Sequence, residues 1–293
     1  MTGFTIGDVR IGRIEETLGL GFEPAALLPD FEPEAIERHA EWLVPNFYSP
    51  PDARFVASQH SWLVRTRDHT VLVDSCVGNH KERPALERFH RLQRPYLDRL
   101  HDAGVGPGDI DIVLCTHLHV DHVGWNTRLD NGRWVPTFSN ARYIFSRREE
   151  AFWNPETGNA DFALNAGVYE DSVTPVIEAG QAQMIDGVHA IDDALTIEPA
   201  PGHTPGHVVL KARSRDAEGV FSGDTVHNPI QVCYPQWNSA FCEDAAQAWA
   251  TRRELLEYCA EHRALLLPAH FGIPHAGRVV HANGAFAMDF AAP

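Results

Sequence analysis

The stretch Thr116-His117-Leu118-His119-Val120-Asp121-His122-Val123-Gly124 places three histidines and one aspartate within six residues. Residues 110–115, directly before it, are apolar and β-branched, which predicts a buried strand. Four potential ligands therefore follow the carboxyl end of a strand, where side chains can converge on metal. Adjacent Asp121 and His122 can serve two ions, or one residue can bind an ion while the other supports it. A solvated loop is the alternative, since the chain holds 17 histidines, but this dense pattern favours a metal site.

The composition is that of an acidic globular protein. The chain has 293 residues and a formal net charge of −16, and it is 44% hydrophobic and 22% charged. Such an acidic surface argues against nucleic acid or an anionic membrane as the main partner, which leaves a small-molecule substrate. No apolar run approaches the ~20 residues of a membrane span. Because no break in composition indicates a linker, we expect residues 1–293 to form a single domain.

Five cysteines, an odd number, contain no Cys-x-x-Cys pair and predict free thiols rather than a disulfide framework. The first twelve residues lack a basic segment followed by an apolar run, so we expect no signal peptide and a cytoplasmic location.

The apolar periodicity predicts strands interleaved with helices. Strands are expected over residues 4–14 (an edge strand), 54–64, 70–73, 110–115, 143–145, 183–185, 194–198, 207–212, 219–222 and 264–267. Helices are expected over residues 34–42, 84–103, 147–153, 161–168, 172–179 and 244–261. Asp130-Asn131-Gly132 predicts a hairpin. Residues 1–54 are expected to supply an N-terminal strand and a lid or arm, whose Pro- and Glu-rich part at 29–51 is a candidate homodimer contact.

Three later segments carry further candidate ligands. His203 lies between two Pro-Gly pairs in Pro201-Gly202-His203-Thr204-Pro205-Gly206-His207, a stiff turn that would hold it in place. Asp224 follows an apolar strand, and its two oxygens are suited to bridging two cations. His270 also ends an apolar strand. Taken singly, each is equally explained as an ordinary turn or structural residue.

Two further residues are candidates for orienting the ligands. Asp74 ends the strand over residues 70–73 and is expected to accept a hydrogen bond from a ligand imidazole or the nearby backbone. A plain turn aspartate is the alternative. His207 is either a residue that supports a ligand or a simple strand residue.

The inventory suits two divalent cations. His117, His119 and His203 are assigned to one ion, Asp121, His122 and His270 to the other, and Asp224 lies between them. Imidazole and carboxylate ligands favour Zn²⁺ with a position open for water. Iron, manganese and cobalt accept the same donors, so the ligands leave the metal open.

Together these motifs resemble the metallo-β-lactamase superfamily of hydrolases. The match comprises His-x-His-x-Asp-His at residues 117–122, the Pro-Gly-His-Thr-Pro-Gly-His stretch, Gly-Asp at Asp224, the strand-end His270 and the strand that leads to Asp74. They occur in the family's order over residues 55–280. The resemblance implies an αββα sandwich, in which two mixed central sheets are flanked by helices and the site lies at one edge.

Within the superfamily, residues 224–231 and 268–271 are most similar to the branch of methyl parathion hydrolases and related lactonases and esterases. Acyl-homoserine lactonases of the superfamily carry a tyrosine three residues after the bridging aspartate. This chain has His227 at that position, and Tyr234 is a candidate substitute.

The resemblance and the ligand set imply hydrolysis of an ester or lactone by a hydroxide held between two metals. Asp121 is the candidate that passes a proton to the leaving group, Asp224 bridges the metals, and His227 is a candidate donor to the substrate. Phe47, Trp125 and Tyr234 are candidate walls of a substrate pocket, although core packing is the more common role of any single aromatic residue.

Three alternatives stay open. The same hydroxide would attack a phosphotriester, and the sequence does not separate the two reactions. A mononuclear iron enzyme resembling persulfide dioxygenases shares the fold, but it does not require the second set of ligands. A non-catalytic binding protein is expected to lack ligands, and none is missing from the motifs.

Overall fold

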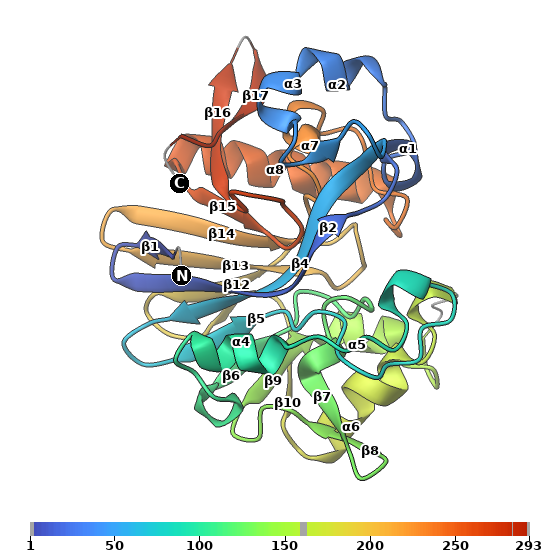
Figure 1. Ribbon diagram of the computed structural model, residues 1–293. Helices are drawn as coiled ribbons and strands as arrows, with labels where there is room; N and C mark the ends of the chain where they lie inside the picture. Colours follow the sequence, from blue (N-terminus) through green and yellow to red (C-terminus); the bar gives the residue numbers. More distant parts are fainter. Residues whose placement is uncertain (1–2, 159–162, 283, 292–293) are drawn as a thin grey trace.

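The computed structural model describes residues 3–158, 163–282 and 284–291. Two mixed β-sheets pack face to face, and helices cover the outer face of each sheet (Figure 1). The predicted αββα sandwich is therefore confirmed. All five cysteines are unpaired, as predicted.

The first sheet has the strand order β1-β2-β4-β5-β6-β9-β10, with β3 paired to β4. Its strands are β1 (Phe4–Ile6), β2 (Val9–Leu20), β3 (Tyr48–Ser49), β4 (Arg54–Arg65), β5 (Thr70–Val73), β6 (Ile112–Leu114), β9 (Arg142–Ser146) and β10 (Ala182–Ile185). Because β5, β6 and β9 run parallel, the loops that follow them meet at one edge of the sheet. The loop after β6 carries the histidine motif to that edge.

The second sheet has the order β11-β12-β13-β14-β15-β16-β17. Its strands are β11 (His189–Ala190), β12 (Leu195–Pro199), β13 (Val208–Ser214), β14 (Ala217–Gly223), β15 (Leu265–Pro268), β16 (Gly277–Ala282) and β17 (Ala285–Asp289). Since β14 and β15 are parallel, Asp224 and His270 leave the sheet at the same edge. A separate hairpin, β7 (Thr127–Asp130) with β8 (Arg133–Pro136), surrounds the predicted Asn-Gly turn.

Helices form the two outer layers. α4 (Tyr96–Asp102), α5 (Arg147–Trp153) and α6 (Thr174–Glu178) lie outside the first sheet. α1 (Pro24–Leu27), α2 (Glu34–Arg38), α3 (Ala40–Leu43), α7 (Ile230–Cys233) and α8 (Ala245–His262) lie outside the second (Figure 1). Short helical turns occupy Glu87–Phe89, Pro107–Asp109, Gly124–Asn126 and Ala163–Asn165, and a π-helical turn spans Tyr169–Val173. None of the described helices has the length and apolar composition needed to cross a bilayer.

The alternation of side chains along the strands creates three hydrophobic layers. In β6, Ile112 and Leu114 face the layer between the sheets, where they join Phe221 and Leu267 of the second sheet. Val113 points the other way, into the layer beneath α4 to α6. Both faces of the central strands are therefore buried, as their continuous apolar sequences predict.

The N-terminal segment differs from the predicted edge strand. β1 forms the edge, and β2 is paired on both sides, with β1 and with β4. The turn between them begins at Gly7, whose φ of 56° suits glycine. The helix predicted over residues 34–42 is divided into α2 and α3, and these helices pack on the outer core of the second sheet through buried Ala35 and Leu43. A role of this segment as a lid or dimer contact stays a prediction.

The prediction of a helix over residues 84–103 is wrong for the first half of that range. Only α4 and a 3₁₀ turn at Glu87–Phe89 form within it. Pro95 denies a continuous helix one backbone donor and disfavours helical geometry at Arg94. The Arg94 amide instead donates to the Asn79 side chain at 2.7 Å. The non-helical stretch runs along the cavity described below.

Two other helix predictions need correction. Of residues 161–168, residues 161–162 lie outside the described part, and the rest contains a short 3₁₀ turn rather than an α-helix. The helix predicted over 172–179 begins as the π-helical turn and continues as α6. The β16–β17 hairpin, which was not predicted, extends the second sheet beyond β15.

Candidate metal centre

The edge shared by the two sheets gathers the predicted ligands. The loop after β6 supplies His117, His119, Asp121 and His122, the β12–β13 loop supplies His203, and the ends of β14 and β15 supply Asp224 and His270. Asp121 is half-buried, and the other six side chains are buried. Their candidate ligand atoms form two neighbouring groups.

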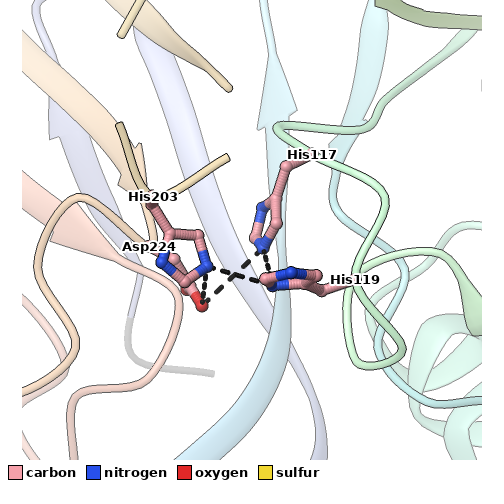
Figure 2. Close-up of side chains that lie close together, drawn as sticks. All are labelled: His117, His119, His203 and Asp224. Atoms are coloured by element: carbon pink, nitrogen blue, oxygen red, sulfur yellow. Dashed lines mark hydrogen bonds and ion pairs between the residues drawn. The ribbon is translucent and has the colours of Figure 1, made fainter. Parts of the chain in front are cut away.

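The first group is His117, His119 and His203 with Asp224 (Figure 2). Nδ1 of His119 lies 3.0 Å from Nε2 of His117 and 3.0 Å from Nε2 of His203. Oδ2 of Asp224 lies 3.8 Å from Nε2 of His117 and 3.5 Å from Nε2 of His203. Four ligand atoms therefore surround one small volume, the arrangement that a tetrahedral or larger coordination sphere needs.

The second group is Asp121, His122 and His270. The Nε2 atoms of His122 and His270 lie 3.3 Å apart. Each of these nitrogens lies 3.7 Å from an oxygen of Asp121. Oδ1 of Asp224 is 3.3 Å from Nε2 of His122 and 2.9 Å from Nε2 of His270. Asp224 thus turns one carboxylate oxygen to each group, which is the placement of a bridging ligand.

In the second group, the other ring nitrogen of each histidine has a partner that fixes the orientation of the imidazole. Nδ1 of His122 donates to Oδ2 of Asp74 at 2.9 Å. Nδ1 of His270 donates to the backbone carbonyl of Ser58 at 3.1 Å. These bonds turn Nε2 of each ring, with its lone pair, toward the centre.

The two residues predicted to support the ligands lie next to them. Asp74 accepts the His122 proton and also the backbone N–H of Thr116 at 2.7 Å. Nε2 of His207 accepts the backbone N–H of Asp224 at 3.1 Å. Asp74 therefore holds one ligand imidazole, whereas His207 holds the backbone of the bridging carboxylate.

Burial keeps the first group of histidines neutral. It lowers the pKa of His119 to about 4 and brings the pKa values of His117 and His203 well below the usual range. Burial also acts on His122, but the surrounding carboxylates, Asp224 foremost, outweigh it and raise that pKa. The first group therefore presents lone pairs at neutral pH, while the second concentrates negative charge that a cation would balance.

Glu149 connects the two loops that carry the ligands, although no sequence motif marks it. It is fully buried on α5. One carboxylate oxygen accepts the backbone N–H of Leu118 at 3.0 Å, between the two ligand histidines. The other accepts the Thr204 hydroxyl at 2.8 Å and the Gly206 N–H at 2.9 Å in the His203 loop. Only its tertiary environment distinguishes it from neighbouring surface glutamates, so no local signal in the sequence would have found it.

A cavity opens over Asp121, Asp224 and His270. Its walls are mainly apolar and include Phe22, Leu27, Leu86, Phe89, Leu164 and Phe241. His227 also lines it, with Nε2 3.1 Å from Oδ2 of Asp224. Neither ring nitrogen of His227 has a hydrogen-bond partner among the described residues. The cavity therefore combines an apolar body with a polar floor at the two groups of ligands.

The three aromatic residues predicted to line the pocket do not reach it. Trp125 stacks on Tyr96 at 5.0 Å between ring centroids. Phe47 packs against Phe271 at 5.9 Å in the outer core of the second sheet. Tyr234 stacks on Trp237 at 4.0 Å. All three rings pack in the hydrophobic cores, and other phenylalanine and leucine side chains line the cavity instead.

Known proteins with similar sequences include two curated hydrolases. N-acyl homoserine lactonase AiiB of Agrobacterium fabrum is 34% identical over 77 residues, which are 22% of this chain and 27% of that protein. Probable metallo-hydrolase YybB of Bacillus subtilis is 27% identical over 155 residues, 51% of this chain and 54% of that protein. The chain thus spans about a quarter to a half of the length of these relatives.

Solved structures share the fold over nearly the whole chain. The dizinc quorum-quenching lactonase AidC superposes with a TM-score of 0.77 at 20% identity, covering 98% of this chain and 96% of that one. At this identity the likeness is one of fold. The family model described as the metallo-beta-lactamase superfamily matches residues 54–270, from the start of β4 to His270. With this match over most of its length, the chain belongs to the metallo-beta-lactamase superfamily.

Proposed function

We propose that the chain is a metal-dependent hydrolase that opens lactones and related carboxylic esters, using two divalent cations for which zinc is the first candidate. The position of Asp224 carries this proposal, because its two oxygens face two separate groups of buried ligand atoms. A single metal would leave one of these groups without a use.

The donor set fits cations. In the second group, His122 and His270 each use Nδ1 to donate a hydrogen bond, so both Nε2 atoms face the centre. These nitrogens lie 3.3 Å apart beside a carboxylate oxygen of Asp224, whose charge raises the pKa of both imidazoles against burial and favours their protonated forms without metal. A divalent cation would displace these protons and supply the positive charge that the acidic cluster requires. Imidazole nitrogen and carboxylate oxygen are the donors that zinc accepts, and iron, manganese and cobalt accept them as well.

The reaction needs a nucleophile, a stabilised oxyanion and a proton for the leaving group. Two divalent cations, when bound, lower the pKa of water toward neutrality and polarise a carbonyl. Asp121 lines the cavity and is the least buried of the seven ligands, so we assign it the transfer of a proton to the leaving alkoxide. His227 lines the cavity with Nε2 3.1 Å from Oδ2 of Asp224 and makes no hydrogen bond among the described residues, and we assign it the orientation of the carbonyl or leaving oxygen. The apolar walls exclude bulk water from these steps.

The named activities of similar proteins support lactones as the first substrate class to test. AiiB is named an N-acyl homoserine lactonase and AidC a dizinc lactonase, while YybB is named only a probable metallo-hydrolase. An apolar cavity above the metal groups suits an ester or lactone with a hydrophobic substituent. Membership of the methyl parathion hydrolase branch stays a prediction.

A substrate panel tests the proposal. The zinc-loaded protein is assayed on a γ-lactone with an alkyl side chain, an aryl ester, a thioester and a paraoxon-like phosphotriester. We expect the largest kcat/KM on the lactone or the aryl ester. A larger kcat/KM on the phosphotriester would replace the proposal with phosphotriester hydrolysis. Turnover of none of the four would refute a hydrolase of this class. Oxygen uptake by the protein as purified, with one iron per chain, would instead indicate the oxygenase alternative.

A further inference from the structure

Arg88 is a cationic side chain in the wall of the otherwise apolar cavity. Among the described residues that line this cavity, it is the one arginine or lysine. Its guanidinium carbon lies 5.0 Å from the ring centroid of Phe22 and 4.9 Å from that of Phe89. Both rings also line the cavity, so cation–π contacts hold the guanidinium against the wall of the cavity.

The guanidinium of Arg88 has no ion pair or hydrogen bond with the described residues. Most other arginines of the chain have such partners: Arg83, for example, makes two 2.7 Å bonds to Asp171. Burial lowers the pKa of Arg88, with the negative charge of Asp121 acting in the opposite direction. A half-buried guanidinium with five unused N–H donors is unfavourable unless another molecule supplies acceptors.

Among the described residues that line the cavity, no carboxylate is available to pair with Arg88. Its two aspartates, Asp121 and Asp224, belong to the groups of candidate metal ligands. Its other polar side chains are the amides of Gln59 and Asn228 and the imidazoles of His119, His227 and His270, none of which is a carboxylate. The acceptors for Arg88 therefore come from solvent or from a ligand, and an anionic ligand satisfies a planar guanidinium better than water or another neutral acceptor does.

We propose that Arg88 is a specificity-determining residue that binds a carboxylate carried by the substrate, separated from the scissile ester or lactone by an apolar spacer. This inference rests on the proposed hydrolase function and narrows its substrate class. The scissile carbonyl would lie at the two groups of candidate metal ligands. The spacer would contact the phenylalanine and leucine side chains, and the carboxylate would bind the guanidinium. The net charge of −16 repels an anionic substrate from the protein in general, so the guanidinium of Arg88 supplies a local attraction in the cavity wall.

Matched substrates test the role of Arg88. Alkyl-substituted γ-lactones that end in a carboxylate, a primary amide or a methyl group are compared at several spacer lengths, with the zinc-loaded wild type, Arg88→Gln and Arg88→Lys. We expect Arg88→Gln to lower kcat/KM roughly 10- to 100-fold more on the best carboxylate substrate than on its methyl counterpart, mainly through KM. Arg88→Lys retains the charge and should keep part of this preference. Raised salt should reduce the preference of the wild type.

The matched control is Arg94→Gln. Arg94 is an exposed arginine of the same segment, and its side chain makes no hydrogen bond or ion pair with the described residues. This variant removes the same charge from outside the cavity, so we expect unchanged selectivity. Equal losses on the carboxylate and methyl substrates in Arg88→Gln would overturn the inference, and so would equal losses on the carboxylate and amide substrates.

A binding measurement separates this inference from the proposed function. Linear dicarboxylates and monocarboxylates of equal length are titrated into the zinc-loaded proteins by calorimetry. We expect the wild type to bind the best dicarboxylate roughly 10-fold or more tightly than the monocarboxylate, and Arg88→Gln to lose that difference. If no lactone or ester is hydrolysed, the proposed function fails, while a lost difference still supports acid binding by Arg88. No such difference in the wild type would overturn the inference whether or not turnover is observed.

Discussion

The carboxylate of Asp224 faces an imidazole on each side. Its Oδ1 lies 2.9 Å from Nε2 of His270, and its Oδ2 lies 3.5 Å from Nε2 of His203. Burial favours its neutral form, but the imidazoles of His270 and His122 bring its pKa well below the usual range. The carboxylate is therefore ionised at neutral pH even without metal. A neutral amide of the same shape cannot offer an anionic oxygen to both groups.

At this scale we predict that Asp224→Asn lowers the bound metal from two ions to one and lowers kcat on a γ-lactone about 100-fold or more. Elemental analysis and steady-state kinetics check this. Asp216→Asn removes a carboxylate from the turn between β13 and β14 and should change neither quantity. Full occupancy and full activity in Asp224→Asn would show that the carboxylate does not bridge metals.

His227 is the residue whose role depends most on the substrate. Because its ring nitrogens have no hydrogen-bond partners among the described residues, His227→Ala removes no such bond within the protein. We expect this variant to keep its two metals and to lose roughly 10- to 100-fold in kcat/KM on a lactone. Loss of a metal ion in His227→Ala would identify it as a ligand instead.

At the scale of elements, Glu149 connects α5 to the two loops that carry His117, His119 and His203. Its oxygens accept four N–H and O–H donors, including the Trp153 indole at 2.7 Å. Glutamine keeps the shape but points an N–H₂ group at two of these donors. Glu149 therefore supports the loops that carry the first group of candidate ligands.

We predict that Glu149→Gln lowers the free energy of unfolding of the metal-free protein by about 1–3 kcal/mol. Urea denaturation measures it. Glu178→Gln, at an exposed position of α6, is the matched control and should change the stability by less than about 0.5 kcal/mol. Equal stability of the Glu149 variant and the control would contradict a structural role for this carboxylate.

Glu16 on β2 plays a similar role for the loop after β5. It is buried and accepts the backbone N–H groups of Val77 and Gly78 at 3.0 and 2.9 Å and the Trp125 indole at 2.7 Å. Burial raises its pKa from 4.5 to about 7, against these hydrogen bonds, and the charge of Asp121 adds to the rise. The folded state therefore holds a proton that the unfolded state releases between these two pH values.

It follows that Glu16 makes the free energy of unfolding fall as the pH rises from 4.5 to about 7, by at most about 3 kcal/mol. Glu16→Gln cannot titrate, so the pH profile of its unfolding free energy should lack this fall. Urea denaturation across this range, on both metal-free proteins, checks the difference. Parallel profiles for wild type and variant would contradict the raised pKa.

Across the whole molecule, the parts predictable from the sequence were those with local signals. The histidine motif and the strand ends were visible because a strand and the ligands that follow it lie within a few residues, as at Leu114 and His117. Parallel pairing then placed distant strand ends at one edge. The gathering of the seven candidate ligands could therefore be expected before the structure, and the sandwich was implied by the family resemblance that these motifs carry.

The remaining features depend on tertiary context. Phe47, Trp125 and Tyr234 have the composition of pocket residues, but burial among other side chains decides where an aromatic ring lies. The environments of Glu149 and Arg88 are set by segments distant in the chain. The end of helical structure before α4, by contrast, had a local signal in Pro95. The prediction of one long helix gave more weight to the apolar periodicity of residues 84–103 than to this proline.

At the scale of the whole protein, we propose that two divalent ions joined by Asp224 make it a hydrolase of carboxylic esters. The most direct test is a titration of the metal-free protein with zinc, in which lactone hydrolysis and bound zinc are measured together. We predict that activity rises to a plateau at two zinc ions per chain. A plateau at one ion per chain, or two bound ions without hydrolysis of any lactone or ester, would contradict it.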